Sequence, residues 1–183
     1  MTKLHYSPAL GTMARCTSPE RCRFSHWDPE AVRPMAPIEV TGYPRVLKNS
    51  YVGMELRPEI LAPALNQLRS GMASELFDLI TNKKAERDGE DRYHTTLIAP
   101  KEFRELRRRK DFVIPRTDAF SFSLIGVGTA SNSKSQAWYA VVRSDDAGDW
   151  RRQLQLPKLD FHVTLGFTDG DVHNVPKDET TLV

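Results

Sequence analysis

The sequence lacks the long apolar run that a membrane-spanning helix needs. No stretch approaches the ~18–20 consecutive apolar residues required to cross a bilayer, and the mean hydropathy is −0.49. The first residues, Met1 to His5, also lack the apolar segment of a secretory signal. The sequence therefore excludes a helical integral membrane protein and predicts a cytoplasmic one. A phage-encoded chain of this composition would act in the host cytoplasm.

Cysteine is scarce, and neither sign of charge dominates. Two cysteines cannot build a disulfide framework, so Cys16 and Cys22 are free thiols or metal ligands. The 26 basic and 24 acidic side chains leave a net charge of +2, so no overall field identifies a polyanionic partner. Glycine (10) and proline (12) are present at ordinary levels, which argues against wholesale disorder. The 183 residues are enough for one core-bearing domain.

Residues 1–45 differ from the rest of the chain. Closely spaced prolines interrupt any periodic pattern, so this segment is expected to be an irregular arm. From Val46 the order is strand–helix–strand and then strand–strand–helix–strand, which predicts an α+β domain over 46–183. The expected strands are 50–56, 93–99, 120–125, 137–142 and 161–167, with a short one at 180–183. A helix is expected from Pro58, followed by a second helix or a continuation to Ile80, and further helices are expected at 101–110 and 145–156. Residues 81–92 and 126–135 are expected loops, the latter a candidate lid.

The two halves end in the same short motif. The first carries His94-Thr95-Thr96-Leu97 and the second His162-Val163-Thr164-Leu165, so both read His-x-Thr-Leu. Because alternate side chains of a strand share a face, each motif presents an imidazole and a hydroxyl together. A single His-x-Thr strand is commonly structural, but two copies in equivalent strands indicate a shared purpose. A zinc site at the two histidines is the alternative, and no third ligand stands at a suitable spacing.

This pairing suits the cleavage of a phosphodiester. In-line attack at phosphorus needs a base for the nucleophile and an acid for the leaving oxygen, and two histidines titrate in the right range. The hydroxyls of Thr96 and Thr164 can donate hydrogen bonds to the non-bridging oxygens, where charge grows in the transition state. The sequence therefore predicts catalysis by His94 and His162 without a cofactor.

The duplicated motif resembles that of the 2H phosphoesterase superfamily. The resemblance covers about 46–183 and implies a bilobal fold, in which two pseudo-symmetric antiparallel-sheet lobes with outer helices surround a central groove. It implies that His94 and His162 are the acid/base pair and that Thr96 and Thr164 bind phosphate. Members act on RNA 2′,3′-cyclic phosphates, 2′–5′ linkages, cyclic ADP-ribose phosphates and, in phage anti-defence proteins, cyclic oligonucleotide signals.

Other residues are candidates for substrate binding. Tyr51 and Tyr93 can stack on a base or pack in the core, and Trp138 and its neighbour Tyr139 point to opposite faces, so that one of the two can line the groove. The loop after the second motif can bring its polar side chains back to the site or lie on the surface. The cations of 101–110 form a phosphate-attracting helix face or a merely solvated one. The candidate substrate-binding set is Tyr51, Tyr93, Trp138, His173 and Lys177.

The N-terminal arm contains a metal-like spacing. Cys22-Arg23-Phe24-Ser25-His26 resembles the last two ligands of a CCCH-type zinc finger, but the first cysteine of that pattern is missing and only His5 stands near enough to replace it. A tetrahedral site would stabilise an arm too small for a core of its own. The alternative is two idle thiols with surface histidines. The expected structural zinc ligands are His5, Cys16, Cys22 and His26.

The sequence thus favours a metal-independent phosphodiesterase that acts on an RNA-like or cyclic nucleotide. Two alternatives stay open: a module that binds RNA through the basic helix and the arm, and a 2′,3′-cyclic phosphodiesterase of RNA repair. The expected partner is a nucleotide or RNA-like substrate and no membrane.

Overall fold

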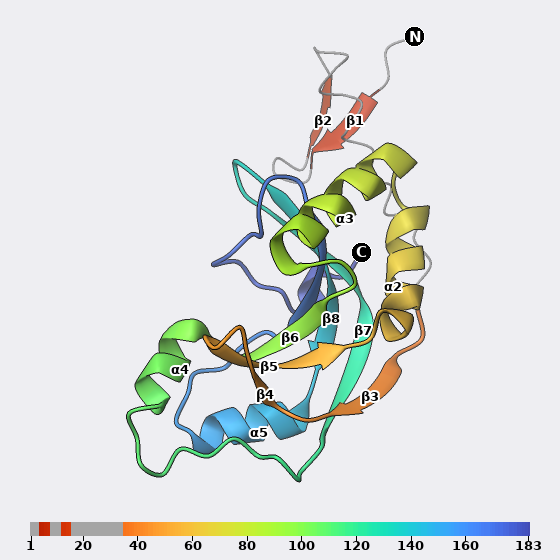
Figure 1. Cartoon of the computed structure of the whole chain (residues 1–183). Coiled ribbons are helices and arrows are strands. Elements are labelled where there is room, and N and C mark those ends of the chain that lie inside the picture. Colours follow the sequence, from red (N-terminus) through yellow and green to blue (C-terminus); the bar gives the residue numbers. More distant parts are fainter. Residues whose placement is uncertain (1–3, 8–11, 16–34) are drawn as a thin grey trace.

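The computed structural model of the chain describes residues 4–7, 12–15 and 35–183. A short antiparallel pair, β1 and β2, lies in the N-terminal arm, and the remaining elements form one α+β domain (Figure 1). The strands are β1 (Leu4–Ser7), β2 (Thr12–Arg15), β3 (Ile38–Gly42), β4 (Arg45–Leu47), β5 (Tyr51–Leu56), β6 (Tyr93–Ile98), β7 (Phe120–Ser131), β8 (Gln136–Arg143) and β9 (His162–Phe167). The helices are α2 (Pro58–Ser70), α3 (Ser74–Asp88), α4 (Pro100–Leu106) and α5 (Asp145–Gln153), followed by the 3₁₀ turn η2 (Glu179–Thr181).

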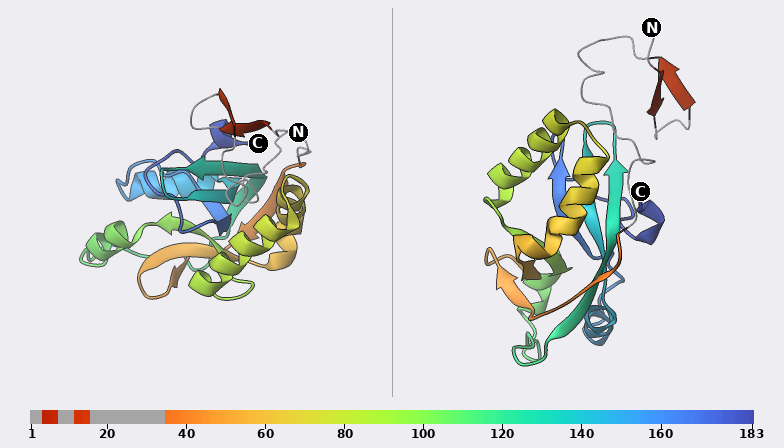
Figure 2. Two further views of the ribbon diagram at one scale, coloured as in Figure 1. Left: turned by 90° about the horizontal axis from the view of Figure 1, so that it is seen from above. Right: turned by 90° about the vertical axis from the view of Figure 1, so that its right-hand side faces the viewer.

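Seven strands form a single curled antiparallel sheet in the order β3-β7-β8-β9-β6-β5-β4. Strands β6 and β9 lie at the centre and join the two halves of the sheet. In the view from above, the half with β5 and β6 lies below the half with β7 and β8 (Figure 2). The predicted α+β class with antiparallel halves and outer helices is confirmed.

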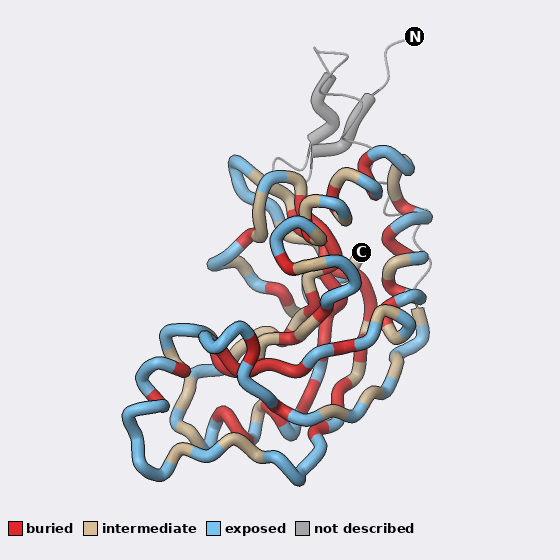
Figure 3. The backbone as a smooth tube through the Cα atoms, viewed as in Figure 1, coloured by how far each residue is buried: buried red, intermediate tan, exposed pale blue. Residues whose placement is uncertain are grey.

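One face of the sheet packs against the helices and forms the core. Buried positions alternate along the central strands, as expected where one face is covered and the other is not, and the buried segments concentrate in the strands (Figure 3). Helix α3 lies directly on β9, where a Cβ on Gly166 would come within 2.7 Å of the Ile80 side chain, so this glycine permits the close approach. The core includes Leu61, Leu68, Leu76, Ile80, Leu97, Phe122, Leu124, Trp138, Val163 and Leu165.

Several sequence predictions are corrected. The expected loop 81–92 is helical up to Asp88, because its Lys, Ala, Glu and Arg residues are good helix formers and continue α3. The candidate lid 126–135 is mostly strand: β7 runs to Ser131, and only a tight turn separates it from β8. Helix α4 ends at Leu106 and not at 110.

The two ends of the domain also differ from the prediction. β3 pairs with β7, so the sheet begins before the expected boundary at Val46. The tail forms the 3₁₀ turn η2 and a single bridge between Gly128 and Leu182 where a strand was expected. The irregular geometry follows from the Asp178 side chain, which accepts hydrogen bonds from the Thr180 backbone and hydroxyl and so caps a turn.

Candidate active site

The two motif strands are neighbours at the centre of the sheet. β6 and β9 run antiparallel, with Thr95 opposite Val163. This register places His94 across from Thr164 and Thr96 across from His162. Thr95 and Val163 are fully buried on the helix side, whereas the two histidines and the two other threonines are only partly buried. The four motif side chains therefore share the face that the helices do not cover.

His162 is held by partners on both ring nitrogens. Its Nδ1 lies 3.0 Å from the carbonyl oxygen of Asp160, and its Nε2 lies 3.2 Å from Nζ of Lys177. A carbonyl oxygen can only accept a hydrogen bond and an ammonium can only donate one. Nδ1 therefore carries the proton, and Nε2 holds a lone pair. This is the neutral tautomer that a general base requires.

The electrostatic surroundings keep His162 neutral. Burial of the ring, and then the positive charge of Lys177, lower the pKa of His162 to about 4. Tyr139 contacts the same ring edge-on, with 5.6 Å between the ring centroids. At neutral pH the imidazole thus remains uncharged, with its basic nitrogen directed at Lys177.

Asp171 connects the second motif to two cations. Lys177 Nζ donates to Oδ1 at 2.8 Å, and the Thr164 hydroxyl donates to Oδ2 at 3.0 Å. Arg87, at the end of α3, lies 3.4 Å from Oδ2. Burial alone would raise the pKa of the Asp171 carboxyl, but the charge and hydrogen bond of Lys177, helped by Arg87, lower it to about 2. The Thr164 hydroxyl must turn away from Asp171 before it can donate to a phosphate.

His94 has a different set of neighbours. Its Nε2 lies 3.1 Å from the hydroxyl of Tyr51, with 5.3 Å between the ring centroids. Burial is the main cause that lowers the pKa of His94, and Arg87 acts in the same direction while the Asp88 carboxylate opposes both. Asp88 in turn accepts hydrogen bonds from Arg87, through Oδ1 at 3.1 Å and Oδ2 at 2.7 Å, and from Lys48 at 3.2 Å.

The site brings several cations close to the histidines. Lys48 and Arg87 pair with Asp88, and Arg87 and Lys177 pair with Asp171, while the Asp160 carboxylate also acts on His162. Both imidazoles favour their neutral forms. A cluster of this kind attracts a phosphodiester, whose negative charge would also favour protonation of a neighbouring imidazole.

The structure places two of the predicted substrate-binding residues at the histidines and the other three away from them. Tyr51 and Lys177 lie at the histidines. Tyr93 packs in the core with Lys84 Nζ 3.7 Å from its ring centroid. Trp138 also lies in the core, which corrects its placement at the groove, and His173 is exposed. Of the neighbours Trp138 and Tyr139 on β8, Tyr139 is the one that contacts His162.

Sequence reasoning missed three charged neighbours of the motifs, Arg87, Asp88 and Asp171. Arg87 and Asp88 were hidden in a segment expected to be a loop, although the helical composition of 83–88 was a usable signal. Asp171 follows the second motif by a few residues, and only the fold of the C-terminal segment brings it under Thr164. Tyr139, one of the two β8 residues expected at the groove, pairs with Thr164 across β8 and β9.

The expected zinc ligands cannot be placed by the structure. Cys16, Cys22 and His26 lie outside the described residues, and His5 belongs to β1, whose side chains are likewise outside them. Within the part of the chain that is described, no group of three or more histidine, cysteine, aspartate or glutamate side chains is arranged to hold a metal ion.

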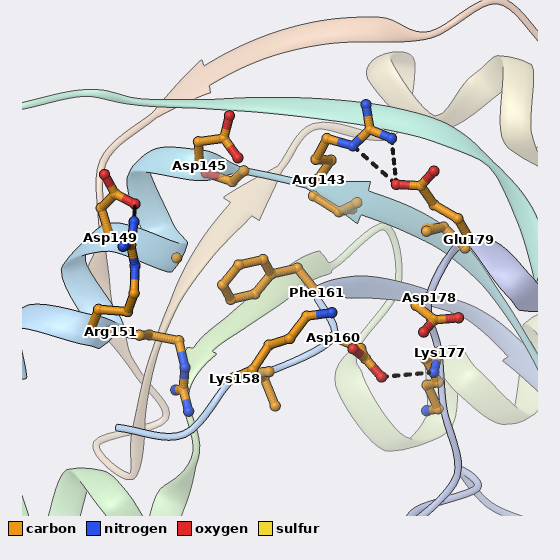
Figure 4. A pocket seen from close by; sticks show the side chains of 16 residues that line it. Arg143, Asp145, Asp149, Arg151, Lys158, Asp160, Phe161, Lys177, Asp178 and Glu179 are labelled. Carbon is orange, nitrogen blue, oxygen red and sulfur yellow. Dashed lines mark hydrogen bonds and ion pairs between the residues drawn. The ribbon is translucent and has the colours of Figure 1, made fainter. Parts of the chain in front are cut away.

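A cavity of about 540 Å³ lies beside His162 (Figure 4). Neither imidazole lines it, but Asp160 and Lys177, the two partners of His162, are shared between the cavity and the site. Lys158 reaches into it, and the Arg143–Glu179 ion pair closes one side. Its size is that of a small-molecule site. The remaining lining comes from Val141, Val142, Ser144, Asp145, Gly148, Asp149, Arg151, Arg152, Leu159, Phe161 and Asp178.

Comparison with known proteins gives one match. Residues 60–173, more than half of the chain, match the family described as "Swiss Army Knife, 2H phosphoesterase domain". This range contains both His-x-Thr-Leu motifs, Arg87, Asp88 and Asp171. Searches of curated proteins and of solved structures found no match. No helix in the described residues is both long and apolar enough to span a membrane.

Proposed function

Because the chain belongs to the 2H phosphoesterase family and is a phosphoesterase of that type, we propose that it cleaves a nucleotide phosphodiester by acid–base catalysis with two histidines. The observation that carries this proposal is the register of β6 and β9, in which each histidine faces the threonine of the other motif. A phosphate bound over this pair of strands meets an imidazole and a hydroxyl from either side.

The two histidines take different parts in this reaction. His162 is the base: its Nε2 lone pair accepts the proton of the nucleophile, while Nδ1 stays hydrogen-bonded to the Asp160 carbonyl. His94, protonated next to the bound phosphate, donates its proton to the departing oxygen. The nucleophile is the neighbouring 2′-hydroxyl of an RNA-like substrate, or water when the substrate is a 2′,3′-cyclic phosphate. One proton is taken and one is given, so the histidines exchange protonation states.

The other polar groups stabilise the transition state. Thr96 and Thr164 donate hydrogen bonds to the non-bridging oxygens, where negative charge develops. Lys177 releases the His162 lone pair and turns its ammonium to the phosphate, and Arg87 contributes a second positive charge from the end of α3. The neighbouring cavity, which shares Asp160 and Lys177 with the site, accommodates the nucleoside attached to the phosphate.

A panel of substrates tests the proposal. The chain is incubated in EDTA with a short RNA, a 2′,3′-cyclic mononucleotide and cyclic di- and trinucleotides, and the products are separated by chromatography. Cleavage of at least one substrate is expected, and His94→Ala and His162→Ala are each expected to abolish it while keeping the wild-type circular dichroism spectrum.

Three results would contradict the proposal. Retention of most of the turnover by either variant would remove the two-histidine mechanism. Tight binding of a nucleotide that is recovered unchanged would favour the alternative function of a nucleotide-binding module. Loss of activity in EDTA, restored by a divalent metal, would instead indicate a metal-dependent hydrolase.

A further inference from the structure

A second hollow lies at the turn that leads into Tyr51. It has a volume of about 480 Å³ and is formed by the turn between β4 and β5 together with α4 and the residues that follow it. The turn contains two consecutive non-glycine residues in the left-handed region, Lys48 (φ 48°) and Asn49 (φ 52°). The hollow, called the arginine pocket below, is lined by Asn49, Ser50, Pro100, Phe103, Arg104, Arg107 and Arg108.

The charge of the arginine pocket is of one sign. Three guanidinium groups line it, and no carboxylate does. Among residues 35–183, no acidic side chain forms an ion pair with Arg104, Arg107 or Arg108, whereas the adjacent Arg109 is paired with Asp111 at 2.9 Å. Three unneutralised arginines around one cavity repel one another, so an anion bound among them would be stabilised.

The geometry of the pocket suits a phosphate. Guanidinium groups bind phosphate oxygens through two parallel N–H donors. Ser50 and Asn49 add a hydroxyl and an amide at the rim. The buried Phe103 ring forms an apolar floor, and Arg107 lies over it with 5.6 Å between its Cζ and the ring centroid. This contact favours that position of the guanidinium.

A single turn connects the arginine pocket to the histidines. Ser50 lines the pocket, and the next residue, Tyr51, places its hydroxyl 3.1 Å from Nε2 of His94. Lys48, from the same turn, pairs with Asp88 beside His94. The pocket and the histidines therefore lie at the two ends of one short segment, residues 48–51, and an extended oligonucleotide that follows this segment can reach both.

We propose that the arginine pocket binds a second phosphate of the substrate, so that the chain acts on an oligonucleotide and not on an isolated mononucleotide. This inference rests on the proposed function for the identity of the first phosphate. The second phosphate belongs to the nucleotide on the leaving-group side, because the segment that lines the pocket continues into Tyr51, which contacts His94, the proposed acid. The source is a single-stranded RNA or a small cyclic oligonucleotide, which carry the same phosphate chemistry.

Two triple variants of equal charge test the proposal. The pocket variant is Arg104→Gln/Arg107→Gln/Arg108→Gln, and the control variant, Lys101→Gln/Arg109→Gln/Lys110→Gln, removes three charges from the same segment without touching the pocket lining. A further double variant, Arg104→Gln/Arg108→Gln, keeps the Arg107–Phe103 contact and serves if the triple variant unfolds.

Binding is measured with a ten-nucleotide single-stranded DNA, which lacks the 2′-hydroxyl nucleophile and is not consumed. We expect the pocket variant to bind this DNA about 10- to 100-fold more weakly than the wild type at low salt. The affinity of the control variant should fall less than about threefold. The slope of log K against log salt should become shallower by about 0.7 in the pocket variant, the value for the one phosphate that the protein no longer neutralises. Equal weakening in both variants would overturn the proposal, because it would indicate only general electrostatic attraction.

Turnover distinguishes the second phosphate from the first. The pocket variant should lose about tenfold or more in kcat/KM on RNA or on a cyclic dinucleotide, and should keep its kcat/KM on a 2′,3′-cyclic mononucleotide. A selective loss on RNA alone or on the cyclic dinucleotide alone identifies the source. Equal losses on all substrates, or none on any, contradict the proposal. If the wild-type chain cleaves nothing but the binding difference persists, the proposed function fails and the arginine pocket stands.

Discussion

The strands β6 and β9 carry the same His-x-Thr-Leu sequence, yet their histidines lie in different surroundings. His94 contacts the hydroxyl of Tyr51, which can donate or accept a hydrogen bond. His162 lies between a carbonyl oxygen and an ammonium group, which together determine the role of each ring nitrogen. The duplicated motif supplies two like side chains, and the segments packed around them make the two chemically unequal.

This difference also appears in the threonines of the two motifs. The Thr164 hydroxyl donates to Asp171, which is itself held by Lys177 and Arg87. No such carboxylate accepts from Thr96 in the described part of the chain. The half with β9 is therefore an ordered network with buried charges, and the half with β6 is more open to protonation. We assign the base to the first and the acid to the second on this ground.

The largest effect is expected from substitution of the two histidines, and a substrate with an activated leaving group distinguishes the acid from the base. His94→Asn and His162→Asn should each lose about 10³-fold in kcat on an RNA-like substrate, within the range for general acid–base catalysis. On a nucleotide p-nitrophenyl phosphodiester the leaving group needs little protonation. His94→Asn should then recover to within about tenfold of the wild type, and His162→Asn should not.

The same pair of measurements can reverse the assignment. Rescue of His162→Asn with no rescue of His94→Asn would make His94 the base. Rescue of both would mean that neither histidine acts on the nucleophile.

The next effect concerns Lys177, which contacts the lone pair of His162. Removal of its charge in Lys177→Gln should raise the pKa of His162 from about 4 toward its usual range, because one of the two causes that lower this pKa is lost. The acidic limb of the kcat/KM profile should move to higher pH by about one unit. The maximal rate should fall about 10- to 100-fold, because the ammonium no longer faces the phosphate.

Lys158→Gln is the matched control for this experiment. Lys158 lines the neighbouring cavity but makes no contact with His162. Its pH profile should coincide with that of the wild type. If the acidic limb of the Lys177→Gln profile does not move, the charge of Lys177 does not control the titration of His162.

The stability of the fold should depend on pH through the same histidine. The unfolded chain binds a proton at His162 near pH 6.5, whereas the folded chain resists protonation until about pH 4. The unfolded state therefore holds more protons between these values, and stability falls as the pH falls through this window. Between pH 7 and pH 5 the contribution of His162 to this loss is about 2 kcal/mol. Urea unfolding at both pH values measures it.

His162→Asn provides the comparison in that experiment, because its amide can still donate to the Asp160 carbonyl. The variant should lose less stability than the wild type on the same change of pH. Below about pH 4 the two should lose stability together, because Asp171, whose pKa is lowered to about 2, is protonated in the unfolded chain first. Equal losses between pH 7 and pH 5 would mean that His162 is not held neutral by the fold.

The sequence predicts the motif side chains and the face that they share, but not the residues that surround them. The period-2 alternation of β6 and β9 is local, so the sequence predicts that each histidine shares a face with its threonine. The partners of those side chains come from distant segments: Tyr51 from β5, Arg87 from the end of α3, and Lys177 from the C-terminal segment. Such contacts depend on tertiary packing, which local patterns do not encode.

The errors in secondary structure have two different origins. Residues 81–88 are polar, and without an apolar stripe they suggested a loop, although their composition favours the helix that continues to Asp88. The small residues of 126–131 suggested a mobile lid. They are strand residues because β7 pairs with β8 along this stretch. In this second region a tertiary contact overrides local propensity.

The smallest effect is expected at the two tyrosines, one beside each histidine. Tyr51→Phe removes the hydroxyl that lies 3.1 Å from His94 Nε2 and should lower kcat about fivefold, the equivalent of one ordinary hydrogen bond of about 1 kcal/mol. Tyr139→Phe keeps the ring contact with His162 and removes the hydroxyl, which is hydrogen-bonded to the Thr129 carbonyl and to Thr181. Its kcat should not change. Because Tyr51 contacts the proposed acid, its effect should also disappear with the p-nitrophenyl substrate, and a loss that persists there would place Tyr51 in substrate binding.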